Sequence, residues 1–209
     1  MISAGFIKIC GITSIEDAQM VAQSGASALG LIVASSKRQI SLETAERIAR
    51  SVDDFPVVLV VRHMSDEDVL RATDVVQPSF VQVHDELSTE LQMQLRARNV
   101  TVITAISSQQ PDIPSVSTSH GDIVMIDGPS PGSGQSVDWR LLASGDFPPF
   151  ILAGGLTPEN VSEAIRVTRP LGVDVASGVE SSPGVKSALL VEQFVNSAKM
   201  AYKELEGSL

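Results

Sequence analysis

The chain of 209 residues contains one cysteine, three histidines and few aromatic residues. A single cysteine excludes an intramolecular disulfide and any metal site built from several thiolates. The histidines are scattered and form no His-x-x-x-His pair of the kind that zinc enzymes use; they are His63, His84 and His120. Neither a disulfide scaffold nor a multi-cysteine metal site is therefore expected.

Positive charge is scarce as well, since 15 lysines and arginines stand against 25 aspartates and glutamates, a formal net charge of −10. An acidic surface repels phosphate backbones, and no run of basic residues offsets this locally, so we expect no nucleic-acid partner. No apolar run reaches the roughly 18 residues of a membrane helix, and the N-terminus lacks the pattern of a signal peptide. We expect a cytoplasmic protein without a membrane partner.

What the chain does have is an alternation of two kinds of segment. Eight short runs rich in Val and Ile are separated by longer stretches, and in several runs both parities are apolar, which is typical of parallel strands covered on both faces. The expected strands are Phe6–Cys10, Ala28–Val33, Pro56–Val61, Phe80–His84, Thr101–Ile106, Asp122–Asp127, Phe150–Ala153 and Val173–Ala176.

The longer stretches have helical period and begin with capping residues. Ser65 precedes three acids, and Thr157-Pro158 places a cap before a first-turn proline. The expected helices are Ser14–Ser24, Ser41–Ser51, Ser65–Val75, Glu86–Arg98, Thr157–Thr168 and Ser187–Leu205. The connection Ser107–Ser119 has two prolines and no helical period, so we expect a loop there.

This rhythm predicts an α/β fold, a single (βα)8 (TIM) barrel domain over residues 1–209 in which a loop replaces the fifth helix. An open doubly wound sheet fits less well, because it usually has fewer strands at this length. The first strand–helix turn also lacks the Gly-x-Gly-x-x-Gly motif of the dinucleotide-binding sheets.

Active sites of such barrels lie at the carboxyl ends of the strands, where the sequence places Cys10 and Asp127. A buried free cysteine is commonly just a small apolar residue, and Asp127 could simply hold the glycine-rich turn that follows it. Their shared place at the mouth favours a general acid–base pair, a thiolate with a carboxylic acid, that needs no cofactor.

Glycine-containing loops follow the last two strands. Gly154-Gly155 and Ser177-Gly178 would let backbone N–H groups approach a phosphate, although Gly-Gly alone could be only a tight turn. Arg38 follows the second strand, and its guanidinium could clamp a carboxylate; a surface arginine is an equally good interpretation.

Alternation along the first strand places Lys8 on the same face as Cys10, toward the barrel interior. A buried lysine needs a partner, and Asp174, on the neighbouring last strand, is the candidate. We predict that the two pair and serve stability more than chemistry. Gln82 and His84 share a parity and are interpreted as interior polar residues near the mouth, with a structural rather than a catalytic role.

Motifs along nearly the whole chain, from Lys8 to about Lys186, resemble phosphoribosylanthranilate isomerase, the (βα)8 enzyme of tryptophan biosynthesis. They follow the order of that family and read KICGIT, EDA, SKRQIS, VQVH, MIDG, GSGQSVDW, ILAGGLTPENV and GVDVASGVESSPGVK. The resemblance implies an Amadori rearrangement of N-(5'-phosphoribosyl)anthranilate to 1-(2-carboxyphenylamino)-1-deoxyribulose 5-phosphate. It implies one small phosphorylated substrate, no metal or other cofactor, and a monomer or homodimer.

The resemblance also assigns roles to residues. Cys10 would be the general base, Asp127 the general acid, and Arg38 the ligand of the anthranilate carboxylate. The phosphate would be held by Gly154, Gly155, Ser177 and Gly178. Departures from the family pattern occur at Gln39, Asp85, Val137 and the loop Pro131-Gly132-Ser133-Gly134; we expect them to alter loop shape and affinity but to leave the acid, base and clamp in place.

Two alternatives remain open at the level of sequence. Another phosphosugar isomerase or epimerase would share the phosphate loops but use different acid–base groups. A non-catalytic barrel that binds a phosphorylated ligand would have no need of Cys10 together with Asp127.

Overall fold

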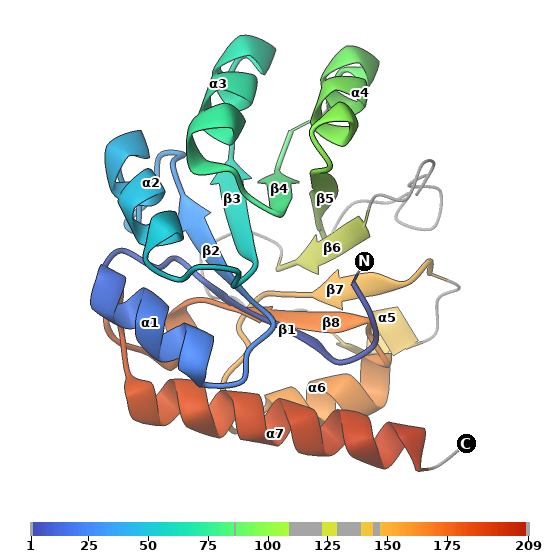
Figure 1. The fold of residues 1–209 in the computed structure, drawn as a ribbon. Helices are drawn as coiled ribbons and strands as arrows, with labels where there is room; N and C mark the ends of the chain where they lie inside the picture. Colours follow the sequence, from blue (N-terminus) through green and yellow to red (C-terminus); the bar gives the residue numbers. More distant parts are fainter. Residues whose placement is uncertain (1, 86, 109–122, 129–138, 144–146, 208–209) are drawn as a thin grey trace.

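Eight parallel strands close into a barrel in a computed structural model of the chain, which describes residues 2–85, 87–108, 123–128, 139–143 and 147–207 (Figure 1). Each strand pairs with its neighbour in sequence, and β1 pairs with β8 to complete the ring. The strands are β1 Phe6–Cys10, β2 Ala28–Ile32, β3 Val57–Val61, β4 Phe80–Val83, β5 Thr101–Ser107, β6 Ile123–Asp127, β7 Phe150–Leu152 and β8 Gly172–Val175. All eight expected strands and the closed (βα)8 barrel are confirmed.

Helices cover the outside of the barrel (Figure 1). They are α1 Ile15–Gln23, α2 Leu42–Arg50, α3 Asp66–Val76, α4 Thr89–Ala97, α5 Trp139–Ala143, α6 Val161–Thr168 and α7 Ala188–Glu206. The six expected helices correspond to α1–α4, α6 and α7. The short α5 was not expected; it follows β6 and is not the fifth helix of the barrel pattern, which would follow β5. The loop predicted at Ser107–Ser119 lies, from residue 109 onward, outside the described residues.

Serine hydroxyls begin most of these helices, because a side-chain oxygen can accept a bond from an N–H group that has no partner inside the helix. The acceptors are Ser14, Ser41, Ser65, Ser88 and Ser187, each bonded three residues downstream. The predicted cap at Thr157 is wrong. Instead, α6 begins at Val161, and the preceding Asn160 reaches back to accept from the Thr157 N–H and to donate to the Gly155 carbonyl.

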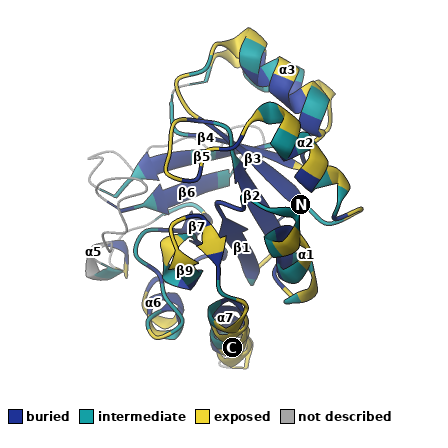
Figure 2. Cartoon of the chain, turned by 90° about the vertical axis from the view of Figure 1, so that its left-hand side faces the viewer, coloured by how far each residue is buried: buried dark blue, intermediate teal, exposed yellow. Residues whose placement is uncertain are grey.

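Two apolar layers hold the fold together, one between the strands and the helices and one inside the barrel. Figure 2 shows the strands of the barrel as mostly buried and the helices as exposed on their outer faces. The rings of Phe6 and Phe80 meet edge to face, 5.9 Å apart, where β1 and β4 begin. They close the amino end of the barrel interior, which leaves the carboxyl end of the strands for a ligand.

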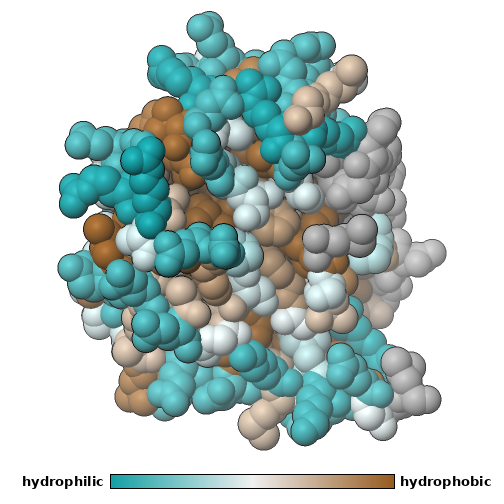
Figure 3. Space-filling view, in the orientation of Figure 1, coloured by the Kyte–Doolittle hydropathy of each residue, from teal (hydrophilic) through white to brown (hydrophobic). Residues whose placement is uncertain are grey.

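The face shown in Figure 3 has hydrophilic side chains around its periphery and hydrophobic ones gathered between them. No helix in the described part of the chain is long and apolar enough to cross a bilayer.

Candidate active site

A small hollow at the carboxyl ends of the strands brings together five of the seven residues predicted from the sequence. Its walls come from the ends of β6, β7 and β8 and from the loop after β2. The predicted residues that line it are Arg38, Asp127, Gly154, Gly155 and Ser177. A second hollow of about 220 Å³ shares Arg38 and is lined further by Lys37, Arg62 and His84. Arg38 therefore lies between these two hollows and contributes to the wall of each.

Cys10 ends β1 and is 5% exposed, directly beside Gly30 of β2 in the parallel register. A methyl group at position 30 would lie 2.8 Å from the Cys10 Sγ and 3.1 Å from the Lys8 Cε, so only glycine leaves room for both side chains. Burial raises the pKa of the Cys10 thiol, and Asp174 raises it further, whereas the ammonium groups of Lys8 and Lys186 oppose the shift.

Lys8 is completely buried, and the predicted pair with Asp174 is confirmed, with 2.8 Å between Nζ and Oδ1. The ammonium also donates to the Gln82 Oε1 at 2.9 Å, and the Gln82 amide lies 3.0 Å from the His84 Nε2. Gln82 is buried as expected. Burial lowers the pKa of His84 to about 4, aided by the charges of Lys8 and Arg62, so this imidazole is neutral at pH 7.

Asp127 ends β6, and its Oδ1 accepts a bond of 2.7 Å from the Gly128 N–H. The carboxylate therefore holds the start of the glycine-rich turn and at the same time lines the hollow. Gly154 has a φ of +87° and packs so closely that a Cβ there would lie 2.5 Å from the Gly128 nitrogen. This contact requires a glycine and fixes the end of β7 against the end of β6.

The loops after β7 and β8 also touch each other. The 3-10 turn η2, Ser177–Val179, follows β8, and a Cβ on Gly178 would lie 1.9 Å from the Leu156 carbonyl oxygen. Gly155, in the same loop as Leu156, has a φ of +65°. Three of the four residues predicted to hold a phosphate therefore line the hollow, whereas Gly178 does not line it and packs against Leu156.

Arg38 is 8% exposed, so its interpretation as a surface arginine is wrong. Its Nε and Nη2 donate to the two carboxylate oxygens of Glu180 at 2.6 and 2.8 Å. Gly11, with a φ of +75°, makes this placement possible, because a Cβ there would lie 2.3 Å from the Arg38 Cδ. The third guanidinium nitrogen, Nη1, is on the side that faces away from Glu180.

Glu180 was not singled out from the sequence, nor was Lys186, whose Nζ lies 2.8 Å from the Glu180 Oε1. Both belong to a hairpin of β9, Glu180–Ser182, and β10, Val185–Lys186. Burial opposes the charge on Glu180, but hydrogen bonds from Arg38 and Lys186 outweigh it and lower the pKa of the carboxyl. Burial lowers the pKa of Lys186, and Glu180 limits that shift.

Arg62 was also missed, although the strand-end rule could have found it, since it comes directly after β3. Together with Lys37 and Arg38 it gives the second hollow three cationic residues in a chain of net charge −10. Of the departures from the family pattern, Asp85 accepts a bond from the backbone of His63 and faces its imidazole, while Gln39 donates to the Val33 carbonyl. Val137 and the loop 131–134 lie outside the described residues.

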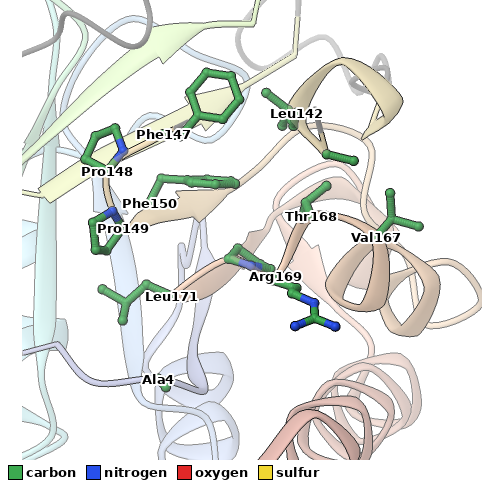
Figure 4. A pocket seen from close by; sticks show the side chains of 12 residues that line it. Ala4, Leu142, Phe147, Pro148, Pro149, Phe150, Val167, Thr168, Arg169 and Leu171 are labelled. Atoms are coloured by element: carbon green, nitrogen blue, oxygen red, sulfur yellow. The ribbon is translucent and has the colours of Figure 1, made fainter. Parts of the chain in front are cut away.

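A larger hollow of about 490 Å³ lies at the other end of the barrel (Figure 4). Its walls include residues that begin or precede strands, among them Ala4, Phe150 and Leu171, together with Phe147 and Arg169. None of the residues predicted for chemistry lines it. This hollow is larger than the two at the carboxyl ends of the strands but contains none of the groups predicted for the reaction.

Comparison with known proteins agrees with this geometry. Residues 7–197 match the family model described as N-(5'phosphoribosyl)anthranilate (PRA) isomerase. The N-(5'-phosphoribosyl)anthranilate isomerase of Haloarcula marismortui is 38% identical in an alignment 208 residues long. The alignment covers 93% of this chain and 96% of that protein.

Solved structures give the same result. Phosphoribosyl anthranilate isomerase from Thermotoga maritima superimposes with a TM-score of 0.84 at 37% identity, covering 93% of this chain and 98% of that one. A phosphoribosyl anthranilate isomerase in complex with reduced 1-(o-carboxyphenylamino)-1-deoxyribulose 5-phosphate superimposes with a TM-score of 0.77 at 35% identity and the same coverage.

Proposed function

The chain belongs to the N-(5'-phosphoribosyl)anthranilate isomerase family, and on that premise we propose that Cys10 is the general base and Asp127 the general acid of its reaction. The protein is an isomerase of tryptophan biosynthesis. It converts N-(5'-phosphoribosyl)anthranilate to 1-(2-carboxyphenylamino)-1-deoxyribulose 5-phosphate by an Amadori rearrangement. We place it in the cytoplasm, because its substrate and product are small intermediates of amino-acid biosynthesis.

Two proton transfers account for the rearrangement. Asp127 protonates the ring oxygen of the ribose, the bond from that oxygen to C1' breaks, and the anthranilate nitrogen supplies the electron pair that forms a Schiff base. The Cys10 thiolate then takes the proton from C2'. The C–H electron pair forms the C1'–C2' double bond while the Schiff base nitrogen becomes a neutral amine, and this enolamine tautomerises to the ketone. All atoms come from one substrate, so two positioned side chains suffice for the chemistry.

The mouth of the barrel offers a partner for each anionic group of the substrate. We assign the phosphate to the loops of Gly154, Gly155, Ser177 and Gly178, where close backbone approach and the opening N–H groups of η2 favour an anion. We assign the anthranilate carboxylate to Arg38, on the Nη1 side that faces away from Glu180. Attraction is local, because the net charge of the molecule would repel a dianionic ligand.

One observation carries the proposal: Asp127 and Arg38 line the same hollow as the glycine-containing loops that follow β7 and β8. A different phosphosugar isomerase would not need a carboxylate clamp beside the acid. A binding protein would need neither Asp127 nor Cys10.

The test follows the fluorescence of freshly prepared N-(5'-phosphoribosyl)anthranilate with wild-type protein, Cys10→Ala and Asp127→Asn. Wild type should consume the substrate, and each variant should lose on the order of 10²–10⁴ in kcat while still binding reduced product, because general acid–base groups contribute about that much. Met200→Ala, a change at a 65% exposed side chain of α7, is the matched control and should behave as wild type. Normal turnover by either site variant would refute its assignment.

A further inference from the structure

The ammonium group of Lys8 lies inside the barrel and takes no part in the two proton transfers described above. Its side chain is 0% exposed and spans the interior from β1. Two of its three N–H donors are directed at the Asp174 Oδ1, 2.8 Å away on β8, and at the Gln82 Oε1, 2.9 Å away on β4. The charge is therefore held from two other strands and cannot turn toward solvent.

The Cys10 thiol lies close to the end of the Lys8 side chain. Alternation along β1 places both side chains on the inner face, and both lie over the bare backbone of Gly30, where a methyl group would meet the Cys10 Sγ at 2.8 Å and the Lys8 Cε at 3.1 Å. The thiol and the end of the lysine side chain thus both occupy the space over Gly30.

Stability alone is a poor explanation for this arrangement. Burying an ion pair removes two charges from water, and a well-packed apolar pair of similar volume is often as stable or more stable. Around this network the barrel interior contains apolar residues such as Val58, Val60 and Met125. A charged network beside the single cysteine calls for a role that apolar residues could not fill.

A thiolate at Cys10 would be a buried negative charge, and such a charge is costly without a partner. The groups that act on it are Lys8 on β1, Asp174 on β8, Lys186 on β10 and, across the mouth, Arg38. His84, at the end of the Gln82 branch, is neutral at pH 7 and adds no charge. Lys186 and Arg38 share Glu180 on the β9–β10 hairpin, whereas Lys8 comes from the same strand as Cys10 and packs with it over Gly30.

We propose that Lys8 is a positioning residue: its ammonium group stabilises the negative charge of the Cys10 thiolate, the form of the side chain that accepts the C2' proton. Asp174 and Gln82 fix the ammonium, and Asp174 also moderates its effect on the sulfur. This inference rests on the proposed function, in which Cys10 is the base. It extends the role of the Lys8–Asp174 pair from stability to the ionisation of that base.

The chain has one cysteine, so the titration of Cys10 can be followed without ambiguity. We would label the cysteine Cβ with ¹³C and record its chemical shift against pH in wild type, Lys8→Met, Asp174→Asn and Lys8→Met/Asp174→Asn. Lys8→Met should move the midpoint to higher pH by about one unit or more, which lowers the thiolate fraction at neutral pH about tenfold. Asp174→Asn should move it to lower pH, and the double variant should fall between the two.

The pH dependence of kcat supplies the functional readout. For Lys8→Met, kcat at pH 7 should fall about tenfold with KM little changed, and it should recover as the pH rises toward the new midpoint. Shifts of opposite sign in the two single variants are an effect that a merely structural lysine would not produce. If Lys8→Met fails to fold, Asp174→Asn and Gln82→Met keep the test open, and Gln82→Met, which releases one hold on the ammonium, should raise the midpoint.

Unchanged midpoints in the folded variants would overturn the proposal. That outcome is distinct from failure of the proposed function, which would appear as normal turnover by Cys10→Ala in an otherwise wild-type chain. Loss of turnover in Cys10→Ala, together with unmoved titrations in the Lys8 and Asp174 variants, would leave Cys10 as the base and Lys8 as a structural residue.

Discussion

At the scale of single residues, the mouth of the barrel depends on places where a side chain is missing. Gly30 leaves room for Cys10 and Lys8, Gly11 for Arg38, and Gly154 for the end of β6. Gly178 is the most crowded of them, since a Cβ there would lie 1.9 Å from the Leu156 carbonyl oxygen, which belongs to the backbone and cannot rotate away. The loops after β7 and β8 can therefore approach this closely only because residue 178 has no Cβ atom.

Gly178→Ala should consequently push these loops apart. We expect KM for the substrate to rise about tenfold or more, because an anion site built from backbone N–H groups loses its geometry, while kcat changes less. Steady-state kinetics at saturating and limiting substrate separate the two effects. Gly207→Ala, at the open end of α7, is the matched control, since the nearest atom to a Cβ there is 3.6 Å away. An unchanged KM in Gly178→Ala would show that the loop does not bind the phosphate.

At the scale of elements, the hairpin of β9 and β10 fixes the side chain of Arg38, which lies far away in the sequence. Glu180 receives the guanidinium of Arg38, and Lys186 neutralises the same carboxylate. The hairpin is itself tied to the first βα unit, because Thr13 donates to the Gly184 carbonyl and the Lys186 N–H donates to Asp17 on α1. The orientation of Arg38 thus depends on a segment about 140 residues downstream.

Glu180→Gln should disclose this dependence as a change in acid stability. The pKa of Glu180 is lowered in the folded protein, so its contribution to stability is present above the ordinary glutamate value of about 4.3 and is lost as the pH falls through the lower folded value. The wild type should be more stable than the variant at pH 7, and the difference should shrink as the pH drops below about 4. Urea unfolding at a series of pH values measures it.

A difference that stays constant from neutral to acidic pH would mean that the Glu180 charge does not stabilise the fold. Glu43→Gln, at an exposed acid in the first turn of α2, serves as the control for a carboxylate outside the Arg38 cluster.

Elements and site differ in how far the sequence predicts them. Strands and helices followed from local patterns, since a strand covered on both faces is apolar at both parities and a helix needs a cap. Lys8 with Asp174 was also predictable, because strand parity and barrel closure together fix which side chains meet. The pairing of Arg38 with Glu180 and of Glu180 with Lys186 was not, because these side chains come together only through tertiary contacts of an irregular hairpin. The start of α6 was misplaced because Asn160, rather than Thr157, organises that turn.

At the scale of the whole molecule, the dominant property is an excess of negative charge. The formal net charge of −10 arises from 25 acids, and only five lysines are among the 15 basic residues. Several of the basic groups are engaged at the mouth or in the interior, namely Lys8, Arg38 and Lys186. Like charges on the remaining surface repel one another and oppose the compact state.

Added salt should therefore raise the melting temperature. Screening extends over a Debye length of about 10 Å at 0.1 M and about 3 Å at 1 M, so most of the gain should come below 1 M. Thermal unfolding in sodium chloride, with an uncharged osmolyte at matched osmolality as the control, distinguishes screening from general exclusion effects. A melting temperature that falls with salt would show that surface ion pairs such as Arg98–Asp74 outweigh the net repulsion.

The closure of the ring by β1 and β8 has a consequence for biosynthesis. Lys8 and Asp174 are register partners in that closure and are separated by 166 positions in the chain, and the two strands lie side by side in Figure 1. A nascent polypeptide presents Lys8 and Cys10 to the cell almost at once, yet Asp174, the carboxylate that pairs with Lys8, arrives only after β8 has left the ribosome. A chain that ends before β8 therefore carries a lysine without its ion-pair partner where the barrel interior will form, so the interior can close only after the last barrel strand is added.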